Sequence, residues 1–150
     1  REEKEMKKIG SYTARGQVPQ QTTERIKLFD GSFKTGYNVV GFKVAPKDVT
    51  GNNSCTGILY SDDDGAGNNN FNWGDNIQIA WAGARGDFND GLQAGYEAVD
   101  TDNMIVEDLF IRCHVSDGTF VNYMIFLEKY DISEWQGALA MARDRAQGDL

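Results

Sequence analysis

The sequence predicts an all-β fold: an antiparallel β-sandwich, jelly-roll-like in type, with one amphipathic helix at its C-terminal end. About seven segments with strand character recur along the 150 residues, and turn signals separate them. This spacing is typical of jelly rolls and of immunoglobulin-like sandwiches, and the alternation does not reveal the strand order. The 17 glycines and two prolines suit a fold rich in tight turns.

The first two-thirds of the chain alternates between short apolar segments and polar loops. By its size the chain is one domain, and we divide it into a charged N-terminal arm (1–8) and a sandwich domain (9–150). Loops longer than about 15 residues are usually functional or interfacial, so the longer ones are candidate contact surfaces. The expected strands are 9–15, 24–29, 37–45, 55–60 and 76–82, and the expected loops are 16–23, 61–75 and 83–102.

The most regular stretch is 104–130, which predicts a long β-hairpin. Apolar and polar residues alternate over 108–115, as in a strand with one buried face. Asp117-Gly118 then supplies the turn. The return run 120–130 is apolar on both faces, so we expect a central strand that is covered twice or covered on one side by a second subunit. A helix over the second face is the simpler of these expectations.

Residues 133–147 predict that helix. Ser133 and Gln136 form a capping-box pattern at its start, and Gly148 ends it. Small and apolar residues recur at helical spacing and form a narrow stripe that allows close packing. The stripe consists of Trp135, Ala138, Leu139, Ala142 and Ala146.

The charge of the chain excludes several partners. A net charge of −8 argues against non-specific binding to nucleic acid or to an anionic membrane, because both attract cations. No apolar run is long enough to span a bilayer. Basic residues cluster in the first 27 positions, among them Lys7, Lys8, Arg15, Arg25 and Lys27, and we interpret this segment as a solvated start to the chain. We therefore expect neither nucleic acid nor membrane as a direct partner.

No constellation in the sequence predicts catalysis or a cofactor. The single histidine, His114, lies in a strand without a neighbouring nucleophile or ligand set, and we interpret it as structural or surface-exposed. Two cysteines are too few for a disulfide framework, and Cys113 falls on the apolar side of its strand. We expect a protein that is not an enzyme, with no catalytic residues and no cofactor.

The loop 61–75 contains the residues best suited to a cation. Asp62, Asp64 and Asp75 are weak calcium candidates, because Ca²⁺ prefers several carboxylate and carbonyl oxygens on a flexible loop. The run lacks the EF-hand spacing and its closing Glu. We therefore prefer a solvated acidic loop and predict no metal site.

Loop aromatics suggest an alternative function. Phe71, Trp73 and Tyr96, among many asparagines, fit a carbohydrate- or receptor-binding platform on a β-sandwich. Trp81 alternates with polar residues in a strand, and we expect it in the core.

Five short runs are similar to known sequences: Met6–Thr13, Arg25–Gly31, Asp102–Leu109, Val121–Ile125 and Asp131–Met141. They resemble short uncharacterised proteins from marine bacteriophage genomes. The resemblance implies a virion structural protein, a small jelly-roll capsid or minor capsid subunit, located in the virion. Its partners would be copies of itself and other virion proteins. The interface residues that we expect for such a subunit are Phe120, Met124, Phe126, Trp135 and Leu139.

Overall fold

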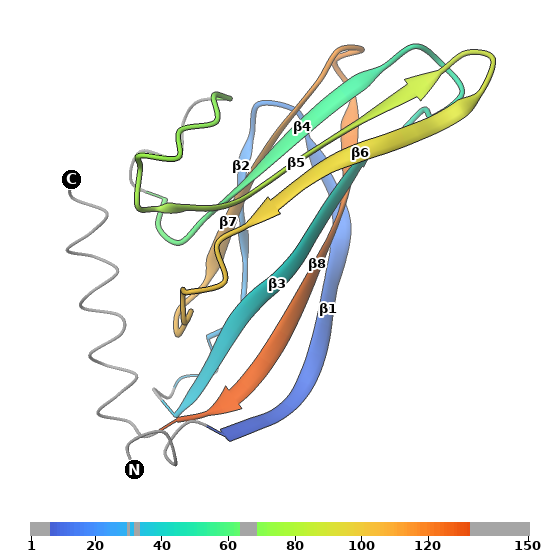
Figure 1. The fold of residues 1–150 in the computed structure, drawn as a ribbon. Helices are drawn as coiled ribbons and strands as arrows, with labels where there is room; N and C mark the ends of the chain where they lie inside the picture. Colours follow the sequence, from blue (N-terminus) through green and yellow to red (C-terminus); the bar gives the residue numbers. More distant parts are fainter. Residues whose placement is uncertain (1–6, 30, 32–33, 64–68, 133–150) are drawn as a thin grey trace.

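Eight β-strands make up the regular structure of residues 7–29, 31, 34–63 and 69–132, the part of the chain that the computed structural model describes (Figure 1). The helix predicted over 133–147 lies outside these residues. The strands are β1 (Lys7–Pro19), β2 (Thr23–Ile26), β3 (Thr35–Pro46), β4 (Ser54–Tyr60), β5 (Gln78–Asp87), β6 (Gly91–Val99), β7 (Leu109–Val115) and β8 (Phe120–Asp131).

The strands form two antiparallel sheets, which confirms the all-β prediction. The three-stranded sheet has the order β1-β8-β3, and the five-stranded sheet has the order β2-β7-β4-β5-β6. The first strand therefore pairs with the last, the second with the seventh, and the fourth with the fifth. Within the described ranges no helix is long and apolar enough to cross a membrane.

One hydrophobic core fills the space between the sheets. Alternate residues of β7 point into it, as the period-two pattern predicts, and alternate residues of β8 meet them from the other sheet. Full burial of such a side chain stabilises the fold by roughly 1.5–3 kcal/mol. These side chains are at most 1% exposed: Leu109, Ile111, Cys113 and Val115 on β7, and Val121, Ile125 and Leu127 on β8.

The predicted hairpin over 104–130 is wrong, because β7 and β8 belong to different sheets. The turn itself forms as expected: Gly118 has a φ of 74°, and the Asp117 carboxylate accepts a bond from the Thr119 N–H at 3.0 Å. However, β7 pairs with β2 and β4, while β8 pairs with β1 and β3. The turn residues set the chain reversal, whereas long-range pairing selects each strand's neighbours.

The predicted loop over 83–102 is also wrong. β5 continues to Asp87, and β6 occupies most of the remainder. Gly86 fits a close backbone approach inside β5, since a Cβ there would lie 2.7 Å from the carbonyl oxygen of Gly51. In the same way β1 continues through the predicted loop start to Pro19. At Gly16 and Gly86 the missing side chain makes room for a close neighbour, and neither glycine ends its strand.

Candidate functional site

The outer face of the three-stranded sheet carries a row of large apolar side chains on β8. Phe120 is 39% exposed, and Met124 and Phe126 are half-buried. We call these three residues the outer row. β8 is the central strand, flanked by β1 and β3, so the row runs down the middle of the sheet. This confirms the prediction of a central strand that is apolar on both faces. The other two predicted interface residues, Trp135 and Leu139, lie outside the described residues.

The surroundings of the outer row are polar and well ordered. The Phe126 ring packs over Gly41, where a Cβ would lie only 2.7 Å from the ring. Lys47 Nζ lies 5.3 Å from the centre of the Phe120 ring. On the β1 side, Gln17 Nε2 donates a hydrogen bond to Asn122 Oδ1 at 2.8 Å. An apolar centre with a polar rim is the usual anatomy of a protein–protein interface.

The outer face of the five-stranded sheet carries the aromatic residues that the sequence singled out. Phe71 and Tyr96 stack with ring centres 6.1 Å apart and 27° between their planes. Trp73 is 67% exposed and packs edge-on against Trp81 at 5.9 Å. We call Phe71, Trp73 and Tyr96 the aromatic cluster. Trp81 is 7% exposed, which confirms its predicted burial, although it belongs to a small second core on this outer face.

A buried amide holds the aromatic cluster in place. Gln78 is 3% exposed, and its Oε1 accepts hydrogen bonds from Trp81 Nε1 and from the Asn72 N–H, each at 2.8 Å. Its Nε2 donates to the carbonyl oxygen of Asn70 at 3.2 Å. Two of these bonds, to Asn70 and Asn72, fasten the loop 69–77 onto the sheet, and the third fixes the Trp81 ring beneath it. The sequence did not identify Gln78, because a single Gln in a strand has no distinguishing pattern.

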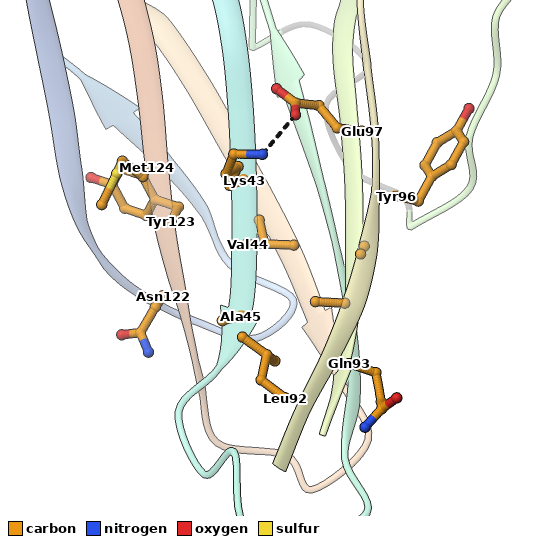
Figure 2. A pocket seen from close by; sticks show the side chains of 13 residues that line it. Lys43, Val44, Ala45, Leu92, Gln93, Tyr96, Glu97, Asn122, Tyr123 and Met124 are labelled. Atoms are coloured by element: carbon orange, nitrogen blue, oxygen red, sulfur yellow. Dashed lines mark hydrogen bonds and ion pairs between the residues drawn. The ribbon is translucent and has the colours of Figure 1, made fainter. Parts of the chain in front are cut away.

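A cleft opens where β3 and β6 face each other at the side of the sandwich (Figure 2). Its volume is about 330 Å³. Figure 2 shows Leu92 pointing toward β3, whereas Gln93 and Tyr96 point away on the far side of β6. The sequence missed the cleft because edges of two different sheets form it. Its walls are mainly apolar, from Val44, Ala45, Ala84 and Leu92.

Glu97 bridges the two sheets at one end of the cleft. Its Oε2 accepts the backbone N–H of Phe42 at 2.7 Å, and its Oε1 lies 3.0 Å from Lys43 Nζ. Desolvation acts to raise the pKa of Glu97, but the bond from Phe42 and then the interactions with Lys43 outweigh it, so the pKa lies below its usual value. The carboxylate therefore stays charged and satisfies an N–H on the open edge of β3.

The remaining candidate residues occupy structural positions. His114 is half-buried opposite Thr56 on the outer face of the five-stranded sheet. Both cysteines are buried free thiols, and desolvation raises the pKa of Cys55 to about 11 and that of Cys113 further. Such thiols are unreactive at neutral pH. In the fold, Cys113 is a small core residue, as predicted.

Two of the calcium candidates, Asp62 and Asp75, lie in the described part of the chain. Asp75 Oδ1 accepts the Ile77 N–H at 3.2 Å, which is a local turn contact. Asp64 lies outside the described residues. Among the residues that the structure describes, no group of three or more His, Cys, Asp or Glu side chains converges as a metal site would require.

Comparisons with known proteins place the chain in no family. No family model and no curated protein matches it. Among solved structures it is similar to a chain of the extra small virus (XSV) VLP of the giant freshwater prawn Macrobrachium rosenbergii, determined by cryo-EM. That similarity has 14% sequence identity and a TM-score of 0.30, and it covers 83% of this chain and 82% of the other. A similarity of this size establishes neither a shared function nor a shared family.

Proposed function

We propose that this chain is a structural subunit of a virus particle, of capsid or minor virion type, which packs against copies of itself and performs no catalysis. The observation that carries the proposal is the outer row on β8. Phe120, Met124 and Phe126 stand in line on the central strand of a sheet and remain partly open to solvent. Asn122 lies between Phe120 and Met124 on the same face, so the row consists of Phe120 and the adjacent pair Met124 and Phe126. Exposed apolar side chains bordered by polar ones mark interaction surfaces.

The strand order supports a jelly roll within this proposal. β1–β8, β2–β7 and β4–β5 are nested antiparallel pairs, as in one long ribbon rolled into two sheets. β3 and β6, the remaining pair, lie side by side and are joined through the Glu97 side chain (Figure 1). Jelly rolls occur in viral capsid domains and in lectin domains. The fold therefore does not distinguish these functions, and the distinction depends on the side chains exposed on the outer faces.

The outer row is pre-organised for binding. β8 is paired along its whole length with β1 and with β3, so its side chains project from a fixed backbone. A rigid surface loses little conformational entropy on association. The resemblance to bacteriophage proteins supports the virion as the location, with other virion proteins as further partners. Trp135 and Leu139, predicted at the same interface, remain part of the proposal.

The test is self-association, measured by light scattering over a dilution series. We expect oligomers whose mass rises with concentration. Met124→Glu places a charge in the outer row and should weaken association at least tenfold. Gln93→Glu makes the same charge change on exposed β6 and should leave it unchanged. A wild-type protein that stays monomeric at every concentration and salt would overturn the proposal.

The aromatic cluster supports a second candidate, a carbohydrate-binding module. Phe71 and Tyr96 are stacked, Trp73 is exposed, and the buried Gln78 fixes the loop that carries two of these three rings. Rigid aromatic faces of this kind suit stacking against a flat ligand. On a glycan array, Trp73→Ala should abolish binding while the protein stays folded. The absence of any glycan binding by the wild-type protein would eliminate this candidate.

A further inference from the structure

β1 has a strand neighbour on one side only in the described part of the chain. It is 13 residues long and forms the edge of the three-stranded sheet opposite β3 (Figure 1). Most of its side chains are exposed, and only Ala14 and Val18 are buried. A long, exposed edge strand offers unpaired backbone groups to another strand.

Three backbone bonds show which β1 groups face the open edge. The N–H of Phe42 points away from β8, to Glu97, whereas the N–H of Lys47 bonds to the carbonyl of Phe120 at 3.2 Å. Phe120 therefore bonds to β3, whereas Ile125, which lies opposite Phe42, does not. Because hydrogen-bonding direction alternates along a strand, the even-numbered residues of β8 bond to β3 and the odd-numbered ones bond to β1. The Gln20 N–H bonds to the Thr119 carbonyl at 3.1 Å and continues this pattern. Because even β1 residues pair with odd β8 residues, the β1 groups left facing outward belong to Ser11, Thr13, Arg15 and Gln17.

Strand length and charge together favour one way of pairing β1 with a second copy of itself. In an antiparallel pair centred on Thr13, Arg15 lies opposite Ser11 of the second copy, and no like charges face each other. Centring the pair on Arg15 places Arg15 against Arg15, and centring it on Ser11 places Arg15 against Lys7. Like charges directly opposite each other destabilise a strand pair. Thr13 is also the midpoint of Lys7–Pro19, so the register centred there pairs β1 over its whole length and still keeps like charges apart.

We infer that two copies of the chain pair through their β1 edges, antiparallel and centred on Thr13, to form a continuous six-stranded sheet. This inference deepens the proposed function and rests on it, since it names one of the contacts by which subunits assemble. A two-fold axis perpendicular to the sheet places both outer rows on the same face. The dimer therefore presents twice the apolar surface of one copy to the next layer of contacts.

Two substitutions test the edge independently. Thr13→Pro removes one outward N–H and leaves the bonds to β8 intact, and proline is tolerated where a strand's N–H faces solvent. Ser11→Lys faces Glu128 within its own chain, which favours the fold, but faces Arg15 across the proposed dimer. Sedimentation equilibrium should show dimerisation at least tenfold weaker for Thr13→Pro and several-fold weaker for Ser11→Lys. Thr13→Val keeps the N–H and should match the wild type.

Amide hydrogen exchange gives the direct readout. In the wild-type protein, exchange at the amides of Thr13, Arg15 and Gln17 should slow as concentration rises. If Met124→Glu abolishes association but neither edge substitution changes it, the edge pairing is wrong and the proposed function stands. If the wild type never associates, both are wrong. Should Thr13→Pro fail to fold, Ser11→Lys decides the question alone.

Discussion

The outer faces of the two sheets differ in how far the rest of the chain covers them. On the five-stranded sheet, the loop 69–77 lies over the second core, and Gln78 fastens it there with two hydrogen bonds to the loop and a third to Trp81 of that core. On the three-stranded sheet, the outer row is only partly buried. The described chain thus covers one sheet with its own loop and leaves apolar side chains accessible on the other.

This contrast shows that a loop can cover an apolar surface without containing many apolar residues. The loop 69–77 is rich in Asn, and the polar composition of 61–75 predicts a solvated loop. A buried amide can hydrogen-bond to the backbone groups of such a loop. These bonds offset the free-energy cost of burying the groups, so a polar loop can pack over a sheet. Among the residues that the structure describes, no comparable buried polar side chain lies beside the outer row. It is therefore the face on which partner contacts are expected.

The largest expected effect compares the two faces of β8. Ile125→Ala removes a fully buried side chain and should lower the free energy of unfolding by about 3 kcal/mol. Phe126→Ala, on the next residue but on the outer face, should cost no more than about half of that in a dilute, monomeric sample. Urea unfolding of both variants measures the difference. Equal costs would mean that the outer row is already covered within one chain.

The next effect tests the cover of the five-stranded sheet. Gln78→Ala leaves Trp81 Nε1 and the Asn72 N–H without their acceptor, and should lower the free energy of unfolding by about 2 kcal/mol. Amide exchange in the loop 69–77 should accelerate more than exchange in the core strands. Gln93→Ala removes an exposed amide from β6 and should change stability by less than about 0.5 kcal/mol. An unchanged loop in Gln78→Ala would show that other contacts hold the cover.

Local patterns in the sequence predicted much of one strand and little of its neighbours. Period-two alternation placed Cys113 in the core, and the doubly apolar run marked β8 as central. The same patterns failed where the partner is distant: the turn at Asp117-Gly118 joins two sheets, and the glycines near Gly86 lie inside a strand. Alternation is a property of one strand, whereas sheet membership depends on pairing across more than 100 residues.

The candidate surfaces follow the same division. The outer row could be read from the sequence because its residues are two to six positions apart on one strand. The sequence predicts the three residues of the aromatic cluster as candidate ligand contacts. It does not predict that Phe71 stacks on Tyr96, because the two residues are brought together only when the chain folds. Gln78 and Glu97 were missed, since each acts through backbone groups of another segment that no local pattern identifies.

The smallest expected change in stability tests the contact between β6 and β3, which joins the two sheets and which we call the seam. Glu97 belongs to the five-stranded sheet but holds the Phe42 N–H and Lys43 of the other, with about a third of its side chain exposed. Because its pKa in the folded state is depressed, its contribution is present at neutral pH and above its usual pKa, and is lost as the pH falls through the folded value. Glu97→Gln should therefore cost about 1 kcal/mol at pH 7 and less at pH 3.

The midpoints of urea unfolding at the two pH values measure the loss of stability in Glu97→Gln. Faster amide exchange at Phe42 would show that the loss arises at this contact. Glu128→Gln is the matched control, because that carboxylate bonds to Lys8 and Tyr130 within its own sheet and has no contact with the seam. It should leave exchange at Phe42 unchanged. If Glu97→Gln costs as much at pH 3 as at pH 7, the carboxylate charge is not what joins the sheets. The seam would then depend on packing along the β3–β6 cleft, and the two sheets would be joined by the same apolar contacts that fill the core.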